Sequence, residues 1–421
     1  MGYYQLFSLA GLINQPYGRR YSSQDHHVLM ERRKHFWIFI STMLRTVIYI
    51  LAVVCLNSVI ADSASSEKIV CYYATGLSNY STPLPPGLDP TLCTHLILIG
   101  SSIIDGQIKP QKPTDPQVYY EKIPLMKKLN PQLKVLLCNG GNFNGVLATS
   151  QNRSRFANSS LPILRKYGFD GLDLDFEFPA WNGLPKYQKH SFSLLLMELH
   201  ALFQQEAALT NRPRLMLTAA VVSTKEITDA SYEVPILAKV LDFINLMCYD
   251  YHAFAYYDPF TGFNSPLYPE KHDSIYGNRS IVFSANYWIL KGMPKSKVVV
   301  GIPLYGHSYK LVFKGSHGVH ALSYGRGENG GFVTYPQVCK YLQSNFTRVF
   351  YEQCQVPYMY KDHLWISYED EESLSIKVNW IKSHGYPGIM VYSMNYDDYL
   401  GVCDGGKTKN PLLKIINKFR L

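Results

Sequence analysis

The chain has 421 residues, of which 47% are hydrophobic and 17% are charged. This composition excludes a wholly disordered chain, and the length accommodates one large α/β barrel. The formal net charge of +9 forms no run of Lys and Arg interleaved with aromatic residues, so we expect no nucleic-acid partner.

Residues 1–66 are predicted to be an N-terminal extension that contains a targeting segment. From Met43 the sequence has a short basic region, an apolar stretch over 46–56 and small residues near Ala61, which is the layout of a cleavable secretory signal. The alternative is an uncleaved signal anchor, with the basic residues 32–34 on the cytoplasmic side. Arg45 inside the apolar stretch is costly in a permanent membrane helix and favours cleavage. The chain is expected to be secreted in the first case and membrane-anchored in the second.

One further sequence feature agrees with export. Five Asn-x-Ser/Thr sequences are candidate glycosylation sites. Their acceptors are Asn79, Asn152, Asn158, Asn278 and Asn345.

Among the eight cysteines, Cys138 and Cys248 each end an apolar stretch and are expected to be buried thiols. Spacing alone does not fix how the other cysteines pair.

Residues 67–421 are predicted to form an α/β domain, because apolar strands alternate with amphipathic stretches. The predicted strands are 68–73, 94–100, 133–138, 169–176, 214–220, 242–248, 297–303 and 387–394. Helical spacing of apolar residues is clear over 191–209. Eight such units favour a closed (β/α)₈ TIM barrel over an open doubly wound sheet. The long gap before the last strand predicts an inserted α+β lobe over roughly 308–380.

The fourth predicted strand carries a row of acidic residues. Side chains alternate along a strand, so Asp173, Asp175 and Glu177 share one face, at spacings of about 6–7 Å. Like charges in a low-dielectric channel cannot all be ionised, so at least one carboxyl should keep its proton near neutral pH. Glu177, the last in the row and nearest the barrel mouth, is the expected general acid.

Rows of carboxylates also occur on solvated edge strands and in calcium-binding loops. An edge strand carries charges, but the alternate positions of this strand are all large and apolar. A calcium loop would need ligands interrupted by Gly and Asn at loop spacing. Neither structure fits this row well, and no metal or other cofactor is expected.

The run YGFDGLDLDFEFP over 167–179 resembles the signature of family-18 glycoside hydrolases, the chitinases and chitinase-like proteins, whose pattern is Asp-x-x-Asp-x-Asp-x-Glu. Segments from KIVCYY (68–73) to GIMVYSMNYDDYLGVC (388–403) support the resemblance in order along the chain. It implies a TIM barrel that hydrolyses β-1,4-linked N-acetylglucosamine polymers with retention, with the substrate's own acetamido oxygen as nucleophile. It further implies that Glu177 is the acid and then the base, that Asp175 orients the acetamido group, and that Asp173 buffers Asp175.

The resemblance also implies a set of substrate contacts and two disulfides. The expected substrate-binding residues are Tyr72, Gly140, Gly141, Met247, Tyr249, Asp250, Tyr305 and Tyr392. The implied disulfides are Cys71–Cys93 and Cys339–Cys403. The expected partner is chitin or a chitooligosaccharide, bound by a monomer.

Several positions depart from the family pattern. The tryptophan that floors the catalytic subsite is Tyr392 here, and the tryptophan after Gly140-Gly141 is Asn142. Phe176 replaces a tryptophan within the signature, Gly76 replaces one after the first strand, and His307 replaces an arginine. Loss of stacking rings predicts weaker or altered binding of the polymer.

Three functions are compatible with these residues. The first is an active chitinase, an endo-β-1,4-N-acetylglucosaminidase, because all the acidic positions are intact. The second is a non-catalytic glycan-binding lectin, which the missing tryptophans favour. The third is a hydrolase of another N-acetylhexosamine glycan, since the same carboxylates serve any substrate with a 2-acetamido group.

Overall fold

The computed structural model describes residues 67–75, 88–270 and 278–420, and residues 30–49 except 32, 33, 36 and 39. The chain divides into two compact units, Met1–Ser65 and Ser66–Leu421. In the first unit, the described residues between 30 and 49 are helical. Most of the predicted signal segment, beyond residue 49, lies outside the described residues. Across the described parts of the chain, no helix has both the length and the apolar character that a membrane span requires.

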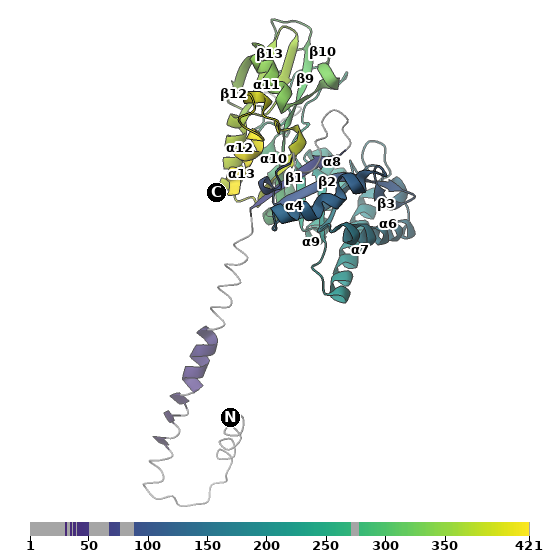
Figure 1. Cartoon of the computed structure of the whole chain (residues 1–421), viewed down its shortest axis with the longest axis vertical. Coiled ribbons are helices and arrows are strands. Elements are labelled where there is room, and N and C mark those ends of the chain that lie inside the picture. The colour runs from purple at the N-terminus through teal and green to yellow at the C-terminus, as the bar shows by residue number, and fades with distance from the viewer. Residues whose placement is uncertain are drawn as a thin grey trace, which may run out of the picture. The chain divides into compact units, whose positions relative to one another are not determined.

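The second unit is built on a closed barrel of parallel strands (Figure 1). The barrel strands are β1 (Lys68–Ala74), β2 (His95–Ile104), β4 (Lys134–Gly140), β5 (Gly171–Asp175), β6 (Met216–Val222), β7 (Phe243–Met247), β8 (Val298–Pro303) and β15 (Gly388–Tyr392). Each strand pairs with the next, and β1 pairs with both β2 and β15, which closes the barrel. The predicted (β/α)₈ barrel is therefore confirmed, and the open doubly wound sheet is excluded.

The barrel strands are near-continuous apolar runs and are buried on both faces. Helices therefore cover the outer face of the barrel. The helices of the second unit are α3 (Asp115–Val118), α4 (Ile123–Leu129), α5 (Asn144–Leu147), α6 (Ser150–Tyr167), α7 (Gln188–Thr210), α8 (Lys225–Ser231), α9 (Val234–Val240), α10 (Ile281–Leu290), α11 (Tyr335–Gln343), α12 (Glu371–Ser383) and α13 (Pro411–Asn417). The predicted helix over 191–209 is α7. Thr149 caps the start of α6, and Gly168, at φ +74°, ends it and turns the chain into β5.

A second, antiparallel sheet is inserted between the last two barrel strands. Its strands are β9 (Tyr305–Leu311), β10 (Ser323–Arg326), β11 (Phe332–Thr334), β12 (Thr347–Tyr351), β13 (Val356–Lys361) and β14 (Leu364–Ser367). Figure 1 shows them gathered at one end of this unit, with α11 beside them. This sheet is the predicted insertion lobe. The sequence did not predict β3 (Gln107–Pro110), which forms a hairpin with β2.

Both implied disulfides are present. Cys71 on β1 is bonded to Cys93 just before β2, and Cys339 on α11 is bonded to Cys403. Cys138 and Cys248 are buried thiols, as expected. Of the candidate glycosylation sites, Asn158, Asn278 and Asn345 are exposed and Asn152 is half-buried, while Asn79 lies outside the described residues.

The two ends of the barrel unit meet at one side chain. Nζ of Lys382 on α12 lies 3.6 Å from a carboxylate oxygen of Glu67, directly before β1. The same ammonium group donates a 3.0 Å hydrogen bond to the carbonyl oxygen of Phe419, after α13. Lys382 therefore links the segment before the first barrel strand to the segment after the last helix.

Asp397 fixes the last helix to the barrel mouth. Its carboxyl group is buried and accepts hydrogen bonds from the backbone N–H groups of Leu412, Leu413 and Asp398. Burial raises the pKa of Asp397 to about 7, although these donors oppose the rise. In the unfolded chain an Asp titrates near a pKa of about 3.9.

We predict that the unfolding free energy decreases as the pH rises from about 4 to about 7. In that window the folded state holds a proton on Asp397 that the unfolded state has released, and the full effect is about 4 kcal/mol. Melting temperatures measured across this range should fall with pH, and Asp397→Asn should flatten the slope. The exposed turn variant Asp362→Asn should leave the slope unchanged. An equal slope in Asp397→Asn and the parent would contradict this account.

Candidate active site

Two acidic residues of β5, and Glu177 just after it, lie along a gradient of exposure. Asp173 is fully buried inside the barrel, Asp175 at the end of the strand is half-buried, and Glu177, two residues further, is exposed at the mouth. This is the alternation predicted from the sequence. The carboxyl ends of the parallel strands form this mouth, which is where barrel enzymes carry their sites.

Asp173 is held by a polar network inside the barrel. Its carboxylate accepts hydrogen bonds from the hydroxyls of Tyr72 (2.7 Å) and Thr218 (2.5 Å) and from Nδ2 of Asn245 (3.2 Å). Asn245 also donates to the Tyr72 hydroxyl at 3.0 Å. Burial raises the pKa of Asp173, and these donors, together with the Cys138 thiol, oppose the rise. The network fixes Asp173 in place below Asp175.

Asp175 and Glu177 both bind protons more tightly than ordinary carboxyls. Burial raises the pKa of Asp175 well above its usual value, and the charges of Glu177 and Asp173 raise it further. The pKa of Glu177 is raised by loss of water in the cleft and then by the charge of Asp250. Among the described residues, Oδ1 of Asp175 is buried and has no hydrogen-bond partner. The site therefore holds an acid near the mouth and an unused acceptor beside it.

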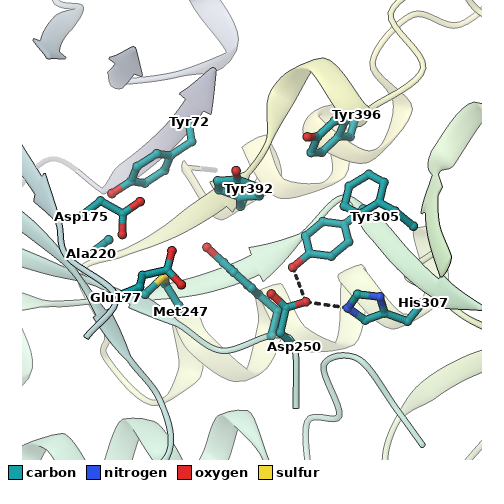
Figure 2. Close-up of a pocket in the computed structure, with 12 residues that line it drawn as sticks. Tyr72, Asp175, Glu177, Ala220, Met247, Asp250, Tyr305, His307, Tyr392 and Tyr396 are labelled. Atoms are coloured by element: carbon teal, nitrogen blue, oxygen red, sulfur yellow. Dashed lines mark hydrogen bonds and ion pairs between the residues drawn. The ribbon is translucent and has the colours of Figure 1, made fainter. Parts of the chain in front are cut away.

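An aromatic hollow of about 700 Å³ opens on one side of Asp175 and Glu177. Figure 2 shows Tyr72, Tyr392, Tyr305 and Tyr396 around it. The ring centroid of Tyr392 lies 6.0 Å from that of Tyr72 and 5.9 Å from that of Tyr249. The other lining residues are Ala220, Met247, Asp250, His307 and Phe332. The tyrosine rings are tilted against that of Tyr392, by 43° for Tyr72 and 37° for Tyr249, and together they give the hollow aromatic walls of the kind that pack against the apolar face of a sugar.

Asp250 is aimed into this hollow from the turn after β7. It has φ +57°, and its backbone N–H donates to the side-chain oxygen of Asn264 at 2.8 Å. One carboxylate oxygen accepts the Tyr305 hydroxyl at 2.7 Å and lies 2.6 Å from Nε2 of His307 (Figure 2). Tyr305 and His307, both on β9 of the inserted lobe, thus fix the carboxylate of Asp250, which comes from the barrel.

A second hollow, of about 1190 Å³, lies on the other side of Asp175 and Glu177. Gly140 and Gly141, at the end of β4, line this hollow and not the aromatic one. A Cβ atom on Gly140 would lie 3.3 Å from the carbonyl oxygen of Asp175, so a larger residue there would have to move β4 and β5 apart by a few tenths of an ångström. The other expected substrate-binding residues gather in the aromatic hollow.

Sequence reasoning missed several residues of the site, four of which show why. Thr218 and Asn245 belong to the Asp173 network, and Phe332 and Tyr396 line the aromatic hollow. Alternation along β7 would have found Asn245, because it shares the inward face with Met247. Phe332 and Tyr396 come from the lobe and from the turn after β15, where no strand pattern gives their direction.

Comparison with known proteins agrees with this geometry. Residues 68–397 match the family model described as glycosyl hydrolases family 18. Chitotriosidase-1 of Mus musculus is 37% identical over 372 residues, which cover 84% of this chain and 78% of that protein.

Two solved structures illustrate the range of these relatives. The immunomodulatory active chitinase TsES1 of Trichuris suis has a TM-score of 0.79 and 34% identity, covering 84% of this chain and 100% of its own. Human YKL-39, a pseudo-chitinase with retained chitooligosaccharide binding properties, has a TM-score of 0.78 and 33% identity, covering 84% and 99%. Similarity alone therefore does not decide between catalysis and binding.

Proposed function

Because the chain belongs to glycosyl hydrolase family 18, we propose that it hydrolyses β-1,4-linked N-acetylglucosamine chains with retention of configuration. The observation that supports this most is the intact row of Asp173, Asp175 and Glu177, with raised pKa values, between two open hollows. A protonated carboxyl at the mouth is the group that such a reaction needs first.

In the first step, Glu177 gives its proton to the glycosidic oxygen, and the bond from that oxygen to the anomeric carbon breaks. The acetamido carbonyl oxygen of the same sugar attacks the anomeric carbon and closes a ring. The free oxygen of Asp175 accepts the acetamido N–H and faces the positive charge that develops there. Glu177, now ionised, takes a proton from water, and the hydroxyl opens the ring and restores the configuration.

The test is release of new reducing ends from chitooligosaccharides by a purified chain spanning residues 62–421. Release of shorter oligomers is the expected result. An absence of turnover at every pH between about 3 and 8, a range wide enough to titrate both carboxyls, would reject the proposal. Peptidoglycan and N-glycan substrates measured beside chitin address the third candidate function.

A second candidate function is glycan binding without cleavage. The relative YKL-39 supports it, and so does the replacement of stacking tryptophans by Tyr392 and Asn142. Saturable oligosaccharide binding by a chain that releases no product would favour it. The presence of Glu177 in the position of the acid favours the hydrolase.

Secretion also belongs to the proposal. Two disulfides fit an oxidising compartment. Glycosylation of the exposed acceptors Asn158, Asn278 and Asn345 would accompany that route.

We predict that Asp250→Asn moves the alkaline limb of the kcat/KM profile to lower pH. The charge of Asp250 helps to raise the pKa of Glu177, so without that charge Glu177 loses its proton at a lower pH. The measurement is the pH profile of hydrolysis of a soluble oligomer. Tyr305→Phe is the control, because it removes a hydrogen bond to Asp250 but keeps the charge. A limb that does not move in Asp250→Asn would show that this charge does not act on the acid.

A further inference from the structure

The second hollow differs in chemistry from the aromatic one. Its polar side chains are hydroxyls and amides, from Ser101, Ser102, Gln111, Asn142 and Asn144. The charged groups among its described lining residues are the carboxyls of Asp175 and Glu177, and none of those residues is cationic. An anionic ligand would therefore meet only like charge there.

The hollow also offers no ring for stacking among its described residues. Its aromatic member, Phe176, is 4% exposed, and its ring packs outward against Phe143 and Phe192 at centroid distances of 5.1 and 6.3 Å. Asn142 occupies the position directly after Gly140-Gly141 and is exposed. A sugar in this hollow must be held by its edges, through hydrogen bonds, and not by its faces.

A chain of hydrogen bonds orients the two asparagines. The backbone N–H of Ala180 donates to Oε1 of the buried Gln188, so Nε2 of Gln188 is the group that faces Asn144. That Nε2 donates to Oδ1 of Asn144 at 2.6 Å. The backbone N–H of Asn144 donates in turn to Oδ1 of Asn142 at 2.9 Å. Both amide oxygens are thus engaged by the protein, whereas neither NH₂ group has a hydrogen-bond partner among the described residues, so both remain as donors for a ligand.

The role of the two NH₂ groups follows from which sugar of the substrate occupies each hollow. The sugar with the reacting acetamido group belongs in the aromatic hollow, beside Met247, Tyr249 and Asp250. Glu177 faces both hollows, so the sugar on the other side of the scissile bond enters the polar one.

We propose that Asn142 and Asn144 determine leaving-group specificity, by donating hydrogen bonds to the oxygens of an uncharged sugar in the polar hollow. This inference rests on the proposed hydrolase function and specifies its substrate class as soluble N-acetylglucosamine oligomers. Fixed donors need sugar oxygens that are free to accept, whereas in insoluble chitin those oxygens are already paired with neighbouring chains.

The experiment compares two leaving groups on the same catalytic machinery. The substrates are N-acetylglucosamine tetramer, which leaves as a sugar, and 4-methylumbelliferyl chitobioside, which leaves as a flat phenol that lacks the hydroxyl, acetamido and ring oxygens of a sugar. Asn142→Ala and Asn144→Ala should each lower kcat/KM for the tetramer by about three- to tenfold, the effect of one hydrogen bond. Hydrolysis of the aryl substrate should stay within about twofold of the parent, a loss well below that of one hydrogen bond. Gln204→Ala, which removes an exposed amide on α7, is the matched control for both.

The outcomes separate the two claims. Turnover of the aryl substrate by the parent supports the hydrolase, and its absence with both substrates rejects the hydrolase. Equal losses on both substrates, or none on either, overturn the role of the asparagines while the hydrolase stands. A further arm uses insoluble chitin, on which Asn142→Trp should be faster than the parent because it restores a stacking surface. A parent that is as fast as Asn142→Trp on insoluble chitin would overturn the substrate class.

Discussion

Replacing Glu177 with glutamine is expected to lower kcat/KM for chitooligosaccharides by about 10²- to 10⁴-fold, the usual contribution of a general acid. The amide keeps the shape of the side chain but has no proton to give to the glycosidic oxygen. Binding should change little, since the amide fills the same volume and leaves the other side chains of the aromatic hollow in place, so calorimetry should give a Kd close to that of the parent. The loss should be smaller for an aryl glycoside whose acidic phenol leaves without protonation.

The matched control is Glu121→Gln, an exposed glutamate away from the cleft residues. It should leave both kcat/KM and Kd unchanged. A loss in Glu177→Gln no larger than in this control would remove Glu177 from the mechanism. A large loss of binding in Glu177→Gln would instead indicate a structural role.

The second large effect is expected for Asp175→Asn, with kcat/KM reduced by about 10²- to 10³-fold. Oδ1 of Asp175 is buried and has no partner in the part of the chain that the structure describes, so we expect it to accept the acetamido N–H and to face the positive charge. Asparagine keeps an acceptor but cannot ionise as positive charge develops on the closing ring, so the loss should fall on the ring-closed state and not on ground-state binding.

A stable thiazoline analogue of chitobiose tests this distinction, because it imitates the closed ring. Its Kd should rise far more in Asp175→Asn than the Kd of the unreacted oligomer does. Equal weakening of both would mean that Asp175 only helps to bind the substrate. Thr224→Ala, which alters a side chain outside both hollows, is a suitable control.

Much of the barrel could be predicted because its strands bury both faces. Such strands read as continuous apolar runs, and the predicted 297–303 and 387–394 correspond to β8 and β15. Closure could not be derived from local pattern, because β1 pairs with β15 more than three hundred positions later. The hairpin strand β3 has only four residues, too few for an alternating pattern to stand out.

The site was predictable where one strand carries it and unpredictable where several elements meet. Period-two alternation placed Asp173, Asp175 and Glu177 on one face. The hydrogen-bond chain from Ala180 through Gln188 to Asn144 joins the loop after β5 and the first residue of α7 to the first residue of α5, and no periodic pattern relates these positions. The contact between His307 and Asp250 likewise depends on how the inserted sheet packs against the barrel, which the sequence pattern does not give.

The shared contact of Lys382 with Glu67 and Phe419 has a consequence for how the molecule can be handled. Both ends of the barrel unit lie near the amino end of β1. The carboxyl groups of Asp175 and Glu177 lie at the carboxyl ends of the strands, on the opposite side of the barrel. A bead, a resin or a fusion partner attached at either end would therefore hold the barrel by its base. The substrate opening would face the surrounding solution whichever end was tethered.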